Sequence, residues 1–482
     1  MIGGSTSYSA VYQYRTGTET TTVSAVSHYP SHLARKIHQF FSRSRQPLPP
    51  LRTLTAIVET AYFASMKCEE TRNIICTLAY MNPDDPDPDA PPHIRPQRWT
   101  YFRLGERLRL TEHNLVKLSQ AAPSYSACVA IFSDKGGTPF IWRLTDQEIH
   151  FRTSLDYEAE GHFPRPGIFQ IEIVGIGALS VFDDDQLIAG LRQHSLVKGF
   201  HDVLHFGPIA KVLEPYIVDF IDRVERAVSR KRVVDRDVVD AGLSEVWISA
   251  FCRILLGIRR QEHGGALLLT PARATSGLSA KYQCEYDKLE KALLHYAANA
   301  VLEHDAWLTI VQNFLAADAE TIPCDLYLEH EVAGEDKDDG TKAILGCISF
   351  ISSLSRVDGL VLLSGGLKVR GFGVEVTTRS NPTSVYVSHT ARATRDSIRR
   401  MNFEHFGTRH RSMMRYCNAH PGSLGFVISQ DGDIRAICWV RDRLVMWENI
   451  KLKNVSLLRP PRTATPAHAG VVSSTSTRIK GS

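Results

Sequence analysis

Apolar residues recur at helical spacing in the first part of the chain. The spacing of Leu33, Ile37 and Phe40 predicts a short helix over residues 31–43, and a similar pattern predicts a second helix over 51–67. The residues before the first helix are rich in Ser, Thr and Gly, so we expect a flexible N-terminus that carries one short helix.

Runs typical of strands follow these helices. They are interrupted by an acidic, proline-rich stretch, residues 82–96, which we interpret as a surface loop. The predicted strands cover residues 126–134, 138–145, 148–154 and 167–184. Helices followed by a series of strands are typical of an α+β domain.

The second half alternates between helices and strands. A segment of mixed charge over 208–256 predicts a solvated connecting helix, and the apolar run after Gly264 predicts a buried strand. Further helices are predicted over 285–302 and 338–357, followed by a hairpin across Gly365–Gly366, a helix that begins near Arg409 and two strands around Asp431–Gly432.

The predicted fold class is α+β, with two separate α+β domains. The expected divisions are a flexible N-terminus with a short helix, a first α+β domain, a helical connector, a second α+β domain and a disordered tail, over residues 1–50, 51–200, 201–245, 246–458 and 459–482.

Composition narrows the classes of function. The 482 residues are 43% hydrophobic and 22% charged, and the net charge is only +4, less basic than expected for a protein that coats nucleic acid. Nucleic acid is therefore an unlikely partner. No signal-peptide pattern and no membrane-length apolar run occur, and the nine scattered cysteines contain no C-x-x-C pair, so we expect a cytoplasmic protein with no membrane partner.

Positive charge is concentrated in one region instead. Seven arginines lie between His389 and Arg415, against two acidic residues. Arg409, His410 and Arg411 stand together at the start of a predicted helix, where the helix dipole already contributes partial positive charge. This crowding predicts that an anion binds there.

Two motifs in this half resemble those of the diadenylate cyclase (DisA N-terminal) domain family. The sequence Gly407-Thr408-Arg409-His410-Arg411 matches the family's Gly-Thr-Arg-His-Arg at all five positions, and Asp358-Gly359-Leu360 matches its Asp-Gly-Ala except at the third. A strand that ends near Ser429 completes the pattern. The resemblance covers about residues 246–455, and the N-terminal half is similar to the sensor domains fused to some members.

The resemblance implies a mixed, twisted central sheet flanked by helices. It also implies condensation of two ATP molecules into cyclic di-AMP with release of pyrophosphate, regulated by the N-terminal domain through a small molecule or a protein that the sequence does not identify.

The residue types suit this chemistry. Arginine holds phosphate oxygens in a forked geometry, so Arg409 and Arg411 would bind the triphosphate. Asp358 would accept the proton of the attacking 3′-hydroxyl or hold a metal, and neutral His410 could ligate Mg²⁺ or Mn²⁺. The expected nucleotide-binding residues are Gly359, Leu360, Val376, Gly407, Thr408, Arg409, His410, Arg411 and Ser429, and the expected metal-site residues are Asp358, His410 and Gln430.

One departure from the family leaves an alternative open. Gln430 stands where members commonly have a glutamate that belongs to the metal site, and Asp431 could compensate only if the turn brings it inward. The alternative is a catalytically weak or inactive nucleotide-binding sensor. His201 and His205, at the i and i+4 positions of a possible helix, are a weaker candidate for a metal site.

The product constrains the assembly. Cyclic di-AMP contains two equivalent phosphodiester bonds, so two cyclase domains are expected to meet face to face as a homodimer, each with one bound ATP.

Overall fold

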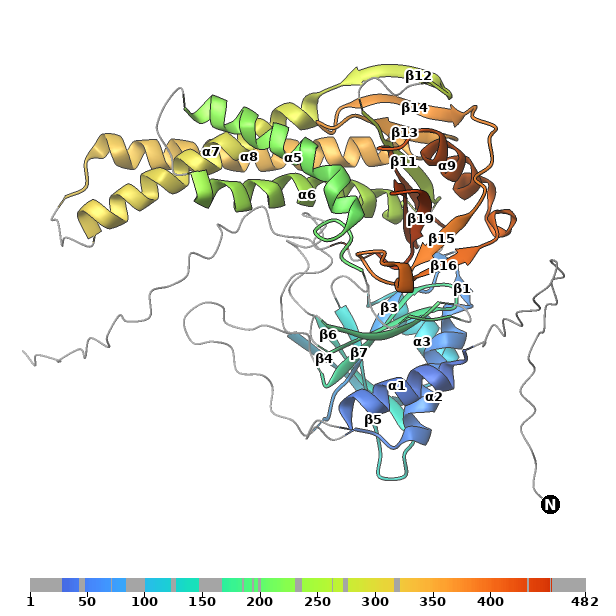
Figure 1. The fold of residues 1–482 in the computed structure, drawn as a ribbon. Helices are drawn as coiled ribbons and strands as arrows, with labels where there is room; N and C mark the ends of the chain where they lie inside the picture. The colour runs from blue at the N-terminus through green and yellow to red at the C-terminus, as the bar shows by residue number, and fades with distance from the viewer. Residues whose placement is uncertain are drawn as a thin grey trace, which may run out of the picture.

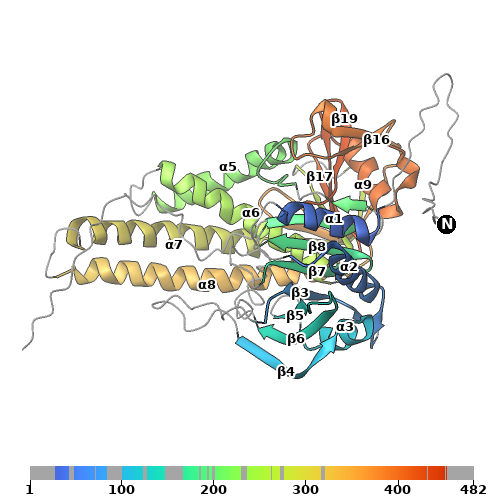
Figure 2. The same ribbon diagram turned by 90° about the horizontal axis from the view of Figure 1, so that it is seen from below.

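The computed structural model contains two large β-sheets, and each of them has its own set of helices (Figures 1 and 2). The structure describes residues 28–42, 48–70, 72–83, 100–122, 127–146, 167–183, 186–192, 195–197, 201–229, 236–261, 263–271, 276–315, 321–430, 433–450 and 452. The predicted α+β class is confirmed.

The N-terminal domain is built on an eight-stranded sheet in the order β10-β9-β8-β7-β3-β5-β6-β4. Its strands are β3 (Cys76–Tyr80), β4 (Thr100–Arg109), β5 (Ala127–Ser133), β6 (Pro139–Asp146), β7 (Phe169–Gly175), β8 (Ala178–Asp183), β9 (Gln186–Arg192) and β10 (Ser195–Val197). A separate two-stranded ribbon consists of β1 (Cys68–Glu69) and β2 (Arg72–Asn73). The helices are α1 (Pro30–Phe41), α2 (Leu51–Ser65) and α3 (Glu112–Ser119).

Helices α1 and α2 pack on this sheet through apolar residues at helical spacing, although Phe40, one of the residues that predicted α1, is exposed. Leu33 and Ile37 are fully buried, and the ring of Phe41 lies 5.9 Å from that of Phe169 in β7. Both predicted helices and the predicted strands over 126–134 and 138–145 are confirmed, whereas the run over 167–184 forms two antiparallel strands, β7 and β8. The predicted strand over 148–154 and nearly all of the acidic stretch over 82–96 lie outside the described residues.

The C-terminal domain is built on a nine-stranded mixed sheet in the order β12-β14-β13-β11-β17-β18-β19-β15-β16. Its strands are β11 (Gly265–Leu269), β12 (Leu278–Tyr286), β13 (Leu360–Leu363), β14 (Val369–Val376), β15 (Val385–Ser388), β16 (Ile398–Met401), β17 (Leu424–Ile428), β18 (Ile434–Val440) and β19 (Arg443–Trp447). The helices are α5 (Pro208–Val228), α6 (Arg236–Arg260), α7 (Lys288–Ile310), α8 (Cys324–Leu354) and α9 (Thr408–Ala419), with short helical turns η1 (Val311–Leu315), η2 (Arg395–Ser397) and η3 (Phe403–His405).

Helices cover both faces of this sheet. Helices α5 to α8 share one hydrophobic core with the first face, whereas α9 packs on the second face through buried side chains that include Met413 and Met414. The α7–α8 pair extends well beyond the sheet (Figure 1).

The segment expected to be a solvated connector takes part in this core. Helix α5 buries one face against α7, through Ile209, Leu213, Phe220, Ile221, Val224 and Val228. The expectation of a solvated helix is therefore wrong for that face. Its mixed charges occupy the remaining positions, and the apolar residues between them recur at helical spacing.

The chain enters the C-terminal domain soon after the last strand of the first sheet. Strand β10 ends at Val197, and the backbone N–H of His201 already donates to the carbonyl of Asn449 at 2.9 Å. Residues 201–206 are not helical, and Nδ1 of His205 lies 2.7 Å from Asp202, so the histidine spacing does not form the helical metal site considered above.

Candidate functional site

Three strand ends meet at one edge of the C-terminal sheet. Strand β11 runs parallel to β13, with Leu267 paired to Val361, and antiparallel to β17, with Gly265 paired to Ile428. Strands lie about 4.8 Å apart. The start of β13, the start of β11 and the end of β17 are therefore neighbours, and these are the places where Asp358, Gly264 and Ser429 stand.

Helix α9 brings the arginines to this edge. Nη1 of Arg409 donates to the carbonyl of His263 at 3.4 Å, just before β11. Gly264 has a φ of +65°, and a Cβ there would lie 2.9 Å from the Ile428 carbonyl and 3.1 Å from Nη1 of Arg409. Glycine is needed at this position both for its backbone conformation and for the space that Arg409 occupies.

Arg411 lies on the same first turn of α9. Its Nη1 donates to Oε2 of Glu404 at 2.8 Å. Its Nε is buried and has no hydrogen-bond partner among the residues that the structure describes. An unsatisfied buried donor on a cation favours an anionic ligand.

The start of α9 adds backbone donors. The N-cap residue is Gly407, which has no side chain to cap the helix, and the first intrahelical bond runs from the N–H of Arg411 to the Gly407 carbonyl. The N–H groups of Thr408, Arg409 and His410 therefore precede the helical hydrogen-bond pattern. Together with the two arginines they form a group of donors suited to phosphate, which we call the phosphate cradle (residues 407–411).

His410 is held by a third arginine. Nη1 of Arg435, in β18, lies 3.1 Å from Nε2 of His410. Burial, and then the charges of Arg435 and Arg409, lower the pKa of His410 to about 4. The imidazole is therefore neutral at physiological pH, as expected, and its Nε2 lone pair accepts from Arg435 because a guanidinium can only donate.

Ser429 is fixed by its own loop. Its backbone N–H donates to the Asp433 carbonyl at 2.9 Å, and its Oγ accepts from the Asp433 N–H at 3.1 Å. Gln430 is exposed, and its backbone nitrogen lies beside Gly264. Asp431, which could replace Gln430 only if the turn brought it inward, lies outside the described residues.

Asp358 and its neighbours form the other side of the edge. Asp358 is exposed, and Gly359 has a φ of +120° and packs so closely on Gly373 that a Cβ would lie 2.5 Å from its carbonyl carbon. Leu360 is buried and pairs with Val374 of β14. Val376, two residues farther along β14, is half-buried at the level of Asp358 and packs with the α9 side of the sheet, so an apolar wall adjoins the carboxylate.

The predicted metal site depends on the side chains of Asp358, His410 and Gln430. Within the described part of the chain, no group of three His, Cys, Asp or Glu side chains could hold a metal ion. Mg²⁺ commonly binds through one or two carboxylates and substrate phosphates, and Asp358 fits that mode. His410 does not fit while Arg435 occupies its lone pair. The roles of Asp358 and Gln430 in metal binding stay predictions.

Sequence reasoning missed four residues of this region. They are Gly264, Glu404, Asp433 and Arg435. The Gly-Gly pair before a buried apolar run was a usable signal for the first. The other three are ordinary charged residues: Glu404 and Asp433 bond to Arg411 and Ser429 a few residues away, and Arg435 reaches His410 only because α9 packs on β18.

Comparison with known proteins identifies one part of the chain. Residues 43–146 match the model of the family described as "Probable sensor domain DACNV". No curated protein and no solved structure matches the chain. None of the described helices is long and apolar enough to cross a membrane. The N-terminal domain therefore matches a sensor-domain model, and the matched residues 43–146 overlap the region 51–200 where a sensor was expected.

Proposed function

We propose that the C-terminal domain is a diadenylate cyclase that condenses two ATP molecules into cyclic di-AMP and releases pyrophosphate. The observation that carries this proposal is the phosphate cradle at the same sheet edge as Asp358, with the buried Nε of Arg411 unsatisfied. The match of residues 43–146 to a sensor-domain model supports the accompanying proposal that the N-terminal domain regulates the reaction.

The proposed reaction proceeds by two equivalent displacements. In each, a ribose 3′-oxygen forms a bond to the α-phosphorus of the other nucleotide, the bond from that phosphorus to the bridging oxygen of pyrophosphate breaks, and the hydroxyl proton passes to a base. Asp358 is the candidate base because it is an exposed carboxylate at the sheet edge. Arg409 and Arg411 would stabilise charge on the phosphates and the leaving group.

A divalent ion, when bound with the nucleotide, would neutralise phosphate charge. Asp358 is the residue of this chain best placed to hold it, together with phosphate oxygens. The chain's own contribution is to position the phosphates through the backbone N–H groups and the arginine side chains of the cradle.

The decisive experiment is to incubate the purified full-length protein with ATP and either Mg²⁺ or Mn²⁺ and to separate the nucleotides by chromatography. Cyclic di-AMP and two equivalents of pyrophosphate support the proposal. ATP binding without turnover in either metal contradicts it and favours the second candidate.

The second candidate is a nucleotide-binding sensor with weak or no turnover. Gln430 and the engagement of the His410 lone pair by Arg435 favour it, because both reduce the ligands available to a metal. Gln430→Glu distinguishes the two candidates. A gain in rate or in metal affinity indicates a weakened metal site, whereas no change means that this position does not limit turnover.

A further inference from the structure

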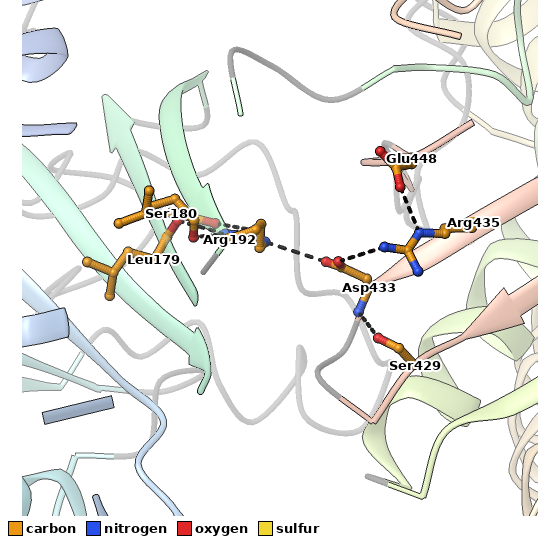
Figure 3. Close-up of polar contacts among 8 residues, drawn as sticks. Leu179, Ser180, Arg192, Ser429, Asp433, Arg435 and Glu448 are labelled. Carbon is orange, nitrogen blue, oxygen red and sulfur yellow. Dashed lines mark hydrogen bonds and ion pairs between the residues drawn. The ribbon is translucent and has the colours of Figure 1, made fainter. Parts of the chain in front are cut away.

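The eight-stranded sheet of the N-terminal domain (strands β3 to β10), which we call the sensor sheet, presents a fixed cation to the C-terminal domain. Nη1 of Arg192, the last residue of β9, donates to the carbonyls of Leu179 at 2.7 Å and Leu191 at 3.1 Å, and Nη2 donates to Oγ of Ser180 at 2.9 Å (Figure 3). Only 15% of the side chain is exposed. Three hydrogen bonds within one sheet hold the guanidinium in place.

The remaining nitrogen of this guanidinium faces the other domain. Nε of Arg192 lies 3.6 Å from Oδ1 of Asp433, at the base of the loop between β17 and β18 (Figure 3). Asp433 is the residue whose backbone makes both hydrogen bonds to Ser429. The ion pair therefore joins the sensor sheet directly to the loop that carries Ser429 and Gln430.

The contacts continue as far as the cradle. Oδ2 of Asp433 lies 3.8 Å from Nη2 of Arg435, and Nε of Arg435 donates to Oε1 of Glu448 at 3.1 Å. Nη1 of the same Arg435 lies 3.1 Å from Nε2 of His410. A continuous series of polar contacts thus runs from Arg192 through Asp433 and Arg435 to His410.

The cross-domain ion pair also stabilises the charge of the buried Arg192 in the N-terminal domain. Burial lowers the pKa of Arg192, and the charges of Asp433 and Glu172 oppose this effect. A buried cation is costly unless it is paired, so separation of the domains would remove one of the carboxylates that stabilise it. The short connection between β10 and His201 keeps the two domains close to this contact.

We propose that Arg192 couples the sensor domain to the phosphate cradle, so that the docked sensor sheet holds the cradle in its nucleotide-binding arrangement. This proposal rests on the proposed function, since it assigns the regulation of the same site. A signal that shifts the sheet would release Asp433, loosen the Ser429 loop and withdraw a positive charge from the region. Both effects weaken the binding of an anionic nucleotide. By reciprocity, ATP binding strengthens sensor docking.

The test uses the full-length protein with three variants. Arg192→Gln removes the cross-domain charge, Asp433→Asn removes its partner, and Ser180→Ala removes a hydrogen bond to Arg192 but leaves the ion pair. Hydrogen exchange is measured without nucleotide at the Ser429 and Asp433 amides, and ATP affinity is measured by calorimetry.

Each variant has a specific expected result. Arg192→Gln should accelerate exchange at both amides and weaken ATP binding about fivefold, which corresponds to about 1 kcal/mol. Ser180→Ala should change the ATP affinity less than about 1.5-fold. Addition of Arg192→Gln to Asp433→Asn should not weaken ATP binding or accelerate exchange any further, because Asp433→Asn has already removed the ion pair.

Two results would overturn the proposal. One is unchanged exchange and ATP affinity in Arg192→Gln, and the other is full additivity of Arg192→Gln with Asp433→Asn. If Arg192→Gln fails to fold, Asp433→Asn alone tests the same contact without altering the sensor sheet. An unchanged ATP affinity in the Asp433→Asn variant would then contradict the proposal. Faster exchange in Arg192→Gln, with no ATP binding by the wild-type protein, would instead reject the proposed function while the structural coupling stands.

Discussion

Nη1 of Arg435 lies 3.1 Å from Nε2 of His410, so the central histidine of the cradle is engaged by an arginine of strand β18. The arginine must donate, which places the imidazole proton on Nδ1 and leaves no lone pair for a metal. His410 therefore acts in this arrangement as a neutral, oriented side chain between two cations.

Replacement of Arg435 by methionine should raise the pKa of His410. That pKa is about 4 because of burial, Arg435 and Arg409, in that order, so the removal of one charge should move it toward 6.5. Titration of the imidazole by NMR measures the shift, and Arg399→Met on the exposed edge strand is the control. An unchanged pKa would contradict the role of Arg435.

The same shift gives a pH dependence of stability. The native pKa of His410 lies below the unfolded value of about 6.5, so the unfolded chain binds the proton first as pH falls. This group should therefore leave stability unaffected above pH 6.5 and reduce it progressively between about 6.5 and 4. Thermal melts should show a smaller loss over this range in Arg435→Met than in the wild type.

Loss of either cradle arginine should abolish product formation. Arg409→Ala or Arg411→Ala removes a charge-assisted contact to phosphate, with an expected loss in rate of about 10²-fold or more. Glu404→Gln is the matched control, since it removes the ion pair of Arg411 and keeps the guanidinium. Near-normal turnover in both alanine variants would refute the assignment of residues 407–411 to phosphate.

Asp358→Asn should separate binding from chemistry. The change is nearly isosteric at an exposed position, so ATP affinity should be largely preserved while turnover at saturating ATP falls. Steady-state kinetics and calorimetry measure the two quantities. A variant that binds ATP poorly but turns over normally at saturation would show that the carboxylate is not the base.

Gly264→Ala should disturb both stability and the cradle. The new Cβ would meet the Ile428 carbonyl and Arg409 at a positive φ, a strain on the order of 1–3 kcal/mol. Gly346→Ala is the matched control, because its Cβ would enter open space on helix α8 and should stabilise the protein by about 0.5–1 kcal/mol. Denaturant melts of the two variants should therefore shift in opposite directions.

Specific activity should rise with protein concentration until dimers saturate, since each product molecule needs two cradles. Mixtures of Asp358→Asn and Arg409→Ala subunits should not recover full activity. Constant specific activity from a protein that stays monomeric by light scattering would exclude the face-to-face arrangement.

Local pattern predicted much of the fold. The helix that begins at Thr408 follows from its glycine cap and apolar positions, and the hairpin of β13 and β14 follows from two apolar runs around Gly365–Gly366. Strands β9 and β10 were not predicted, because β10 has only three residues and β9 is interrupted by Gly190. Such strands gain their stability from neighbours in the sheet rather than from their own sequence.

The site was predictable only where its residues are close in sequence. The cradle residues 407–411 lie on one turn. Arg409 contacts His263, which is 146 residues away in the sequence. Arg435, in strand β18, contacts His410 in helix α9, which packs on the same sheet. Both contacts depend on strand register, which no single segment specifies. The pairing of Arg192 with Asp433 further requires that two domains dock.

The buried face of α5 decides where the chain can be cut. A fragment that begins at residue 246 would lose six buried apolar side chains of that helix, each contributing about 1.5–3 kcal/mol. The total, on the order of 10 kcal/mol, is comparable to the whole stability of an ordinary domain. Such a truncation should yield insoluble protein, whereas a cut at residues 198–200 should release the cyclase-like half with its core intact.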